Sequence, residues 1–273
     1  MVAGELTADS AIALLRDAFA EDETMRALFL GGSHGRGDAD AWSDLDFVAV
    51  AAEPAFADLA ARWLAAVRGA VDVVHTMERR QGPSLLLNLV TADWLRIDLL
   101  LLPPTLLGWN RARDCLAVLF DRDDLAAALP DTLPPRAPDP ARVRHIVTEF
   151  IRVLGLEPVV AGRDEWVVAA TGTGLLRGFV QELLVQESPV PDRGGALGLA
   201  RLLSPEDRAF LADLPYPRPE RDAVIAAHAA LARAFLPRAR AMYDRLGLEW
   251  PRAFEDATRR RLRATLGDGA ADW

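Results

Sequence analysis

The first half of the 273-residue chain carries short apolar runs that are typical of buried strands. The runs are rich in valine and leucine and are separated by glycine, proline and polar residues. They predict strands over residues 25–30, 46–51, 71–76, 85–90, 95–102 and 116–121. Helical spacing of apolar residues predicts two helices in this half, over residues 7–21 and 54–68. Thr7 is the expected N-cap of the first, and the second has a buried face formed by Phe56, Leu59, Trp63 and Val67.

The second half of the chain has a helical pattern. Residues 134–140 contain four prolines and can continue neither a helix nor a central strand, so they predict a linker. Beyond it, helices are predicted over residues 141–154, 166–187, 205–214, 219–246 and 254–266. Because strand-like alternation does not recur there, residues 141–273 predict an all-α helical bundle that follows an N-terminal domain of residues 1–133.

Composition and charge narrow the classes of function. Hydrophobic residues make up 51% of the chain and charged residues 26%, which indicates a globular protein rather than a disordered one. The net charge of −9 argues against broad nucleic-acid binding, because such binding requires a basic face. The chain contains no lysine, so cationic contacts to an anionic ligand must come from arginine or from backbone amides.

The sequence also predicts where the protein works. No apolar stretch is long enough to span a bilayer, so no membrane association is expected. Residues 1–5 lack the basic start of a secretory signal, and Cys115 has no second cysteine to pair with. These features predict a cytoplasmic protein without an intrachain disulfide.

A glycine-rich segment followed by two aspartates carries the strongest chemical signal. Residues 31–37 read Gly-Gly-Ser-His-Gly-Arg-Gly, and Asp44 and Asp46 stand where the strand of residues 46–51 begins. The period of a strand places both carboxylates on one face, where they repel each other. A divalent cation offsets this repulsion, and Mg²⁺ prefers a few carboxylates together with phosphates and water. Glycine amides can approach a phosphate closely, so the segment predicts a metal-dependent phosphate site. The alternative is a surface turn whose aspartates cap the end of a strand.

These positions resemble the active-site signature of the nucleotidyltransferase superfamily that includes DNA polymerase beta. The matching residues are Gly32-Ser33, then ten residues, then Asp44-Leu45-Asp46, with Arg36-Gly37 and Ser43 between them at the family's positions. The segment is especially similar to the small-molecule branch, the aminoglycoside and lincosamide nucleotidyltransferases. The resemblance implies an α/β (α+β) nucleotidyltransferase domain with a mixed sheet, placed before the helical bundle.

The same resemblance implies the ligands of the site. Mg²⁺ is the expected cofactor, Mn²⁺ can substitute for it, and the nucleotide is expected to be bound by Gly32, Ser33, Arg36 and Ser43. The family takes a third carboxylate from a neighbouring strand, and Asp98 is the only acid in the apolar run of residues 94–102. An aspartate there is costly to bury unless it is paired or bound to metal. An ion pair with an arginine is the alternative.

The resemblance also implies roles for two residues of the helical half. In antibiotic nucleotidyltransferases a glutamate of the first helix after the linker removes the proton from the acceptor hydroxyl. Glu149, beside Phe150, matches that glutamate by position and neighbours, and a surface glutamate on an amphipathic helix is the alternative. Arg163, at the start of Arg-Asp-Glu-Trp, resembles an arginine of this half that meets the triphosphate.

Together these residues imply a specific reaction. Asp44, Asp46 and Asp98 would hold the metal ion, and a nucleoside monophosphate, expected to be AMP from ATP, would pass to a hydroxyl of a small molecule such as an aminoglycoside or lincosamide. Two alternatives are adenylylation of a protein partner, as in toxin-neutralising minimal nucleotidyltransferases, and a non-catalytic nucleotide-binding regulator. Transfer to an RNA terminus is disfavoured by the acidic charge.

Overall fold

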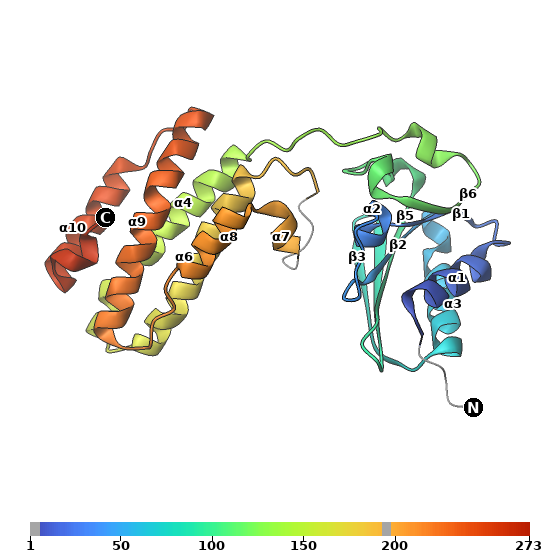
Figure 1. Ribbon diagram of the computed structural model, residues 1–273, viewed down its shortest axis with the longest axis horizontal. Helices are drawn as coiled ribbons and strands as arrows, with labels where there is room; N and C mark the ends of the chain where they lie inside the picture. Colours follow the sequence, from blue (N-terminus) through green and yellow to red (C-terminus); the bar gives the residue numbers. More distant parts are fainter. Residues whose placement is uncertain (1–5, 193–197) are drawn as a thin grey trace. The chain divides into compact units, whose positions relative to one another are not determined.

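The computed structural model describes residues 6–192 and 198–273. The chain divides into two compact units, Met1–Pro134 and Pro135–Trp273 (Figure 1). The first unit contains a mixed sheet with helices and the second is helical, which confirms the predicted fold class. The expectation that residues 1–5 lack a secretory signal concerns residues outside the described ranges.

Six strands form the sheet of the first unit, and every strand predicted from the sequence is present. They are β1 (Met25–Leu30), β2 (Leu45–Ala51), β3 (Val73–Gln81), β4 (Ser84–Thr91), β5 (Arg96–Leu102) and β6 (Ala117–Asp121). Their order in the sheet is β3-β4-β5-β2-β1-β6. Strands β2 and β5 pair in parallel at the centre, and the other four neighbouring pairs are antiparallel. The parallel pair matters most for the site, because it places the starts of β2 and β5 side by side.

Strand β3 differs from its predicted range of residues 71–76. It runs to Gln81, and eight of its nine residues are exposed. Its polar second half carries no alternating apolar pattern, so nothing in the local sequence marks it as a strand. Backbone pairing with β4 forms it instead, and its charged side chains are typical of an edge strand.

Helices α1 (Ala8–Phe19) and α3 (Phe56–Ala70) cover one face of the sheet (Figure 1). The side chain of Thr7 accepts a hydrogen bond from the amide of Ser10, which confirms the predicted N-cap. A fully buried Trp63 packs against Phe19 and Phe47, at ring-centroid distances of 5.3 and 4.8 Å. The whole predicted face of α3 is buried, so this side of the sheet is closed by a tight apolar core.

The segments before and after β6, between β5 and the end of the first unit, pack on the opposite face of the sheet. This stretch contains the short helices η2 (Pro104–Leu106), η3 (Arg113–Cys115) and η4 (Leu125–Ala128). Leu107 and Leu129 from it are buried with Val48 and Val50 of β2. Side chains two residues apart along a strand share a face, so Asp46 lies on the same face as Val48. The carboxylates therefore belong to the face on which this stretch packs.

The described residues of the second unit form helices joined by loops. The helices are α4 (Pro140–Gly155), α5 (Glu157–Gly162), α6 (Trp166–Glu187), α7 (Leu199–Leu202), α8 (Pro205–Asp213), α9 (Arg221–Leu246), α10 (Arg252–Leu266) and the short η6 (Asp268–Ala271). Phe150 of α4 stacks on Phe235 of α9 at a ring-centroid distance of 3.9 Å in the core. Helices α5 and α7 were not predicted, because they are too short to show a helical period. Within the described ranges, no helix combines the length and the apolar character needed to cross a membrane.

The proline-rich segment between the units ends one residue earlier than predicted. Residues 133–139 have no regular structure, and Pro140 is the first residue of α4. Proline is favoured at this position because the first amides of a helix need no partner within it. Asp139 caps the helix by accepting from the amide of Ala141 at 2.9 Å, and its own amide donates to Oε1 of Gln186 at 3.0 Å. The end of the segment is thus tied to the helical unit.

Candidate active site

Asp44, Asp46 and Asp98 come together where β2 and β5 begin. Asp46 and Asp98 stand directly opposite each other in the parallel register, and Asp44 is the residue before β2. One carboxylate oxygen from each residue lies within 4.8 Å of the others, and all three residues are partly buried. The three residues that the sequence analysis expected to hold a metal ion therefore form one cluster.

The cluster carries more negative charge than its surroundings neutralise. Burial, together with the nearby charges of Asp44 and Asp98, raises the pKa of Asp46 to about 6. Burial and the charge of Asp44 raise the pKa of Asp98 as well, while a hydrogen bond from Asn88 acts in the opposite direction. Three crowded carboxylates are the donor set that hard divalent cations prefer. The residues present therefore fit a divalent metal ion.

Gly32 lies against this cluster. Its φ is +54°, in the left-handed region, and a Cβ at this position would lie 1.9 Å from Oδ2 of Asp46 and 2.9 Å from its Cγ. No side chain fits in that space while Asp46 keeps its place. Glycine is needed here so that the backbone can approach the carboxylate cluster.

The glycine-rich segment forms a helical turn, α2 (Gly32–Arg36), which was not predicted from the sequence. The turn is fixed by two backbone contacts. The amide of Gly31 donates to the carbonyl of Asp46 at 2.7 Å, and a Cβ on Gly35 would lie 2.3 Å from the carbonyl oxygen of Cys115. The first amides of a helix have no partner within it, so those of Gly32 and Ser33 are available as donors beside the cluster.

Arg36 and Ser43 occupy different surroundings near the cluster. Arg36 pairs with Asp38 at 3.2 Å, and its positive charge partly opposes the rise in the pKa of Asp46. The hydroxyl of Ser43 accepts from the amide of Asp40 at 2.9 Å and donates to Oδ1 of Asp40 at 3.0 Å. Ser43 thus closes the turn that leads into Asp44.

Sequence reasoning missed two polar neighbours of the cluster. Nη1 of Arg96 lies 3.2 Å from Oδ2 of Asp44, and Nη2 of Arg96 donates to the carbonyl of Trp42 at 3.4 Å. Arg96 precedes Asp98 by two residues, so the strand period could have placed it on the same face. Asn88 stands opposite Asp98 in the antiparallel register of β4 and β5, which no local pattern reveals. An arginine was considered as a partner of Asp98, but the arginine found here pairs with Asp44.

Glu149 and Arg163 belong to the second unit. Arg152 donates to both carboxylate oxygens of Glu149, at distances between 2.7 and 3.0 Å, and lowers the pKa of that carboxyl. Arg163 is exposed at the end of α5. Of the predicted site residues, the structure gathers those of the first unit around one cluster, and these two lie outside that unit.

No protein-family model and no curated protein matches the chain. Among solved structures, an aminoglycoside 6-adenyltransferase from Bacillus subtilis aligns with 14% identity and a TM-score of 0.44, over 92% of this chain and 95% of that one. A nucleotidyltransferase-like protein from Exiguobacterium sibiricum 255-15 aligns with 16% identity and a TM-score of 0.40, over 96% and 89% of the two chains. Both TM-scores are below 0.5, so the chemistry of the site is interpreted from its own residues.

Proposed function

We propose that this protein is a nucleotidyltransferase that moves a nucleoside monophosphate, with ATP as the expected donor, to a hydroxyl of a small molecule. One observation carries the proposal. Three carboxylates from the adjoining starts of two strands lie within 4.8 Å of one another, and the glycine backbone approaches them so closely that a Cβ on Gly32 would collide with Asp46. A surface turn whose aspartates only cap a strand requires neither the third carboxylate nor this close approach.

Asp44, Asp46 and Asp98 are proposed to hold Mg²⁺, or Mn²⁺ in its place. When bound, such an ion neutralises phosphate charge and makes an attacking hydroxyl more acidic. The chain's own contribution is to hold the carboxylates in place before the substrate arrives. Asp46 and Asp98 are fixed by the register of β2 and β5, and Asp44 is fixed by Arg96. Preorganised charge of this kind requires little rearrangement during reaction.

The residues around the carboxylates are proposed to bind the nucleotide. The amides of Gly32 and Ser33 would donate to phosphate oxygens, because they have no acceptor within α2. Arg36 would add positive charge beside them. Ser43 is proposed to act mainly by holding Asp44 in position, since its hydroxyl already bonds to Asp40.

Glu149 is proposed as the general base for the acceptor hydroxyl, and Arg163 as a contact to the triphosphate. The ion pair with Arg152 keeps Glu149 ionised and lowers its pKa, so accepting a proton requires the pair to open. The acceptor is proposed to be a compound of the aminoglycoside or lincosamide type. The net charge of −9 suits a cationic acceptor.

A pyrophosphate-release screen tests the proposal. The purified protein is incubated with Mg²⁺, each of the four ribonucleoside triphosphates, and a panel of aminoglycosides and lincosamides, and products are identified by mass. We expect release that depends on Mg²⁺, that is lost in Asp46→Asn and that is kept in Asp58→Asn, a matched change on the exposed side of α3. Equal release by wild type and Asp46→Asn would overturn the proposal, and so would the absence of release with every nucleotide.

A further inference from the structure

Arg111 is a partly buried cation that has no carboxylate partner among the described residues. Its Nη1 donates to the carbonyls of Trp109 and Leu106 at 3.3 and 3.5 Å, which are long for hydrogen bonds. Among the residues that the structure describes, no carboxylate lies within ion-pair distance of it. Burial alone lowers the pKa of Arg111, with no acidic neighbour to offset that effect. Most of its five N–H donors therefore have no acceptor in the part of the chain that the structure describes.

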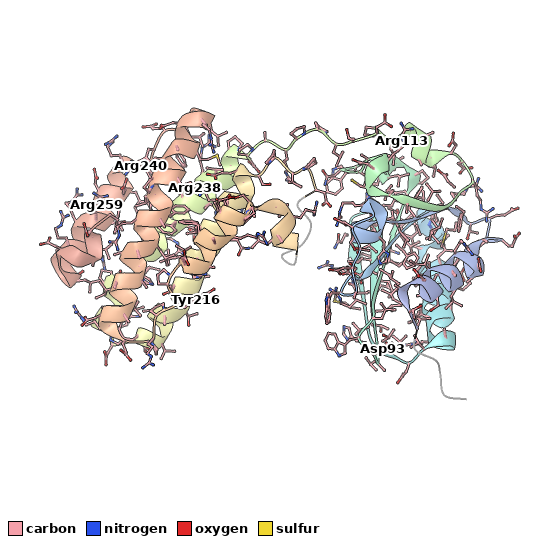
Figure 2. The ribbon with its side chains drawn as sticks, in the orientation of Figure 1. Asp93, Arg113, Tyr216, Arg238, Arg240 and Arg259 are labelled. Carbon is pink, nitrogen blue, oxygen red and sulfur yellow. The ribbon has the colours of Figure 1, made fainter. Side chains whose placement is uncertain are left out.

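Several other arginines of the first unit have acidic partners. Arg113, only two residues away and labelled in Figure 2, pairs with Asp131, and Arg26 pairs with Asp123. Removing a guanidinium from water without a compensating anion is unfavourable. Binding of an anion from outside the chain would explain why Arg111 is partly buried at this position.

Arg111 lies on the face of the sheet that carries the carboxylates. Its acceptor residue Leu106 packs against the apolar cluster that contains Val48 and Val50. Asp46 is two residues from Val48, which is about 7 Å along a strand, on the same face. The chain then runs from Arg111 to Cys115, whose carbonyl lies against Gly35 of α2. The segment that carries Arg111 thus joins the apolar cluster behind Asp46 to the helical turn beside it.

We propose that Arg111 binds the terminal phosphates of the nucleoside triphosphate. This inference rests on the proposed function and adds to it a residue that receives the polyphosphate separately from the metal-holding carboxylates. A guanidinium presents paired N–H donors that match phosphate oxygens, and a polyphosphate supplies the charge that Arg111 lacks. The chain has no lysine that could take this part.

Binding of tripolyphosphate in the presence of EDTA tests the inference without metal and without turnover. Calorimetric titrations compare wild type, Arg111→Gln and the matched control Arg113→Gln. We expect tripolyphosphate to bind wild type and Arg113→Gln with equal affinity, and to bind Arg111→Gln about 10- to 100-fold more weakly, as for loss of a charged hydrogen bond. AMP should bind all three proteins equally, because it has no terminal phosphates.

Thermal melting separates ligand binding from a structural role. Without ligand, Arg111→Gln is expected to melt at or above the wild-type temperature, because the uncompensated charge is gone. Tripolyphosphate should raise the melting temperature of wild type and of Arg113→Gln only. Unchanged tripolyphosphate affinity in Arg111→Gln would overturn the inference, and so would absence of binding to wild type.

The two proposals can fail independently. A protein that binds tripolyphosphate through Arg111 but releases no pyrophosphate in the screen would contradict nucleotidyl transfer and leave the anion site standing. Normal nucleotide transfer by the Arg111→Gln variant, with an unchanged KM for ATP, would contradict the role of Arg111 and leave the proposed function standing.

Discussion

Replacing Gly32 with alanine is expected to damage the metal site far more than the fold. Gly32 has a φ of +54°, and a non-glycine residue in the left-handed region costs about 1–2 kcal/mol. The added Cβ would lie 1.9 Å from Oδ2 of Asp46, so that carboxylate must turn away. Rotating the Asp46 side chain costs little free energy, but its carboxylate then moves away from those of Asp44 and Asp98. We expect a loss of about 1–2 kcal/mol in unfolding free energy and a loss of about 10- to 100-fold in divalent-metal affinity.

Gly37→Ala is the matched control for this prediction. Gly37 belongs to the same segment and has a φ of +76°, but a Cβ there would meet no heavy atom within 4 Å. Both variants carry similar backbone strain, and only Gly32→Ala carries the collision. Urea denaturation measures the strain, and Mn²⁺ titration followed by electron paramagnetic resonance measures metal binding. Equal Mn²⁺ affinity in the two variants would refute the close approach of Gly32 to the metal-holding residues.

Three further predictions follow from the charges. The pKa of Asp46 rises from 3.8 to about 6 on folding, so the folded state holds this proton more tightly and stability falls as pH rises from about 4 to 6. The metal-free Asp46→Asn variant does not lose stability in this way. In urea denaturation at pH 7 it should be more stable than wild type by about 1–2 kcal/mol, after allowance for solvent screening. Glu255→Gln should cost about 3–5 kcal/mol in the same assay, because the buried carboxylate of Glu255 holds Arg240, Trp250 and Arg259. Glu149→Gln should leave ATP affinity unchanged and slow the chemical step by a factor of about 10² to 10⁴ in single-turnover measurements. A normal rate would show that Glu149 is a surface residue and not the general base.

Elements with a strong apolar period could be predicted from the sequence. Strand β1 and helix α6 begin and end at the predicted residues, because each has a long apolar pattern between clear breaks. Strand β3 was predicted only in part, and helix α5 was not predicted. The polar second half of β3 has no apolar pattern and is held by backbone pairing with β4, and α5 is only six residues long.

In the candidate site, some neighbours follow from local spacing and others only from tertiary packing. The period of a strand is enough to place Asp44 and Asp46 together, but Asp98 joins them only because β2 and β5 pair in parallel. The resemblance to a known family supplied that residue. Arg152, three residues after Glu149, could have been foreseen as its partner from helical spacing. The close approach of Gly32 to Asp46 and the lack of a carboxylate near Arg111 among the described residues depend on tertiary packing, which the sequence does not reveal.

The central claim, that the three carboxylates hold a divalent metal ion for a nucleotide, is tested most directly by crystallography. Crystals of the protein with Mn²⁺ and a non-hydrolysable ATP analogue would be measured at a wavelength where Mn²⁺ scatters anomalously. We predict an anomalous peak at about 2.0–2.2 Å from oxygens of Asp44, Asp46 and Asp98, with the phosphates of the analogue beside it. Nucleotide and Mn²⁺ bound elsewhere, with these carboxylates free of metal, would contradict the claim.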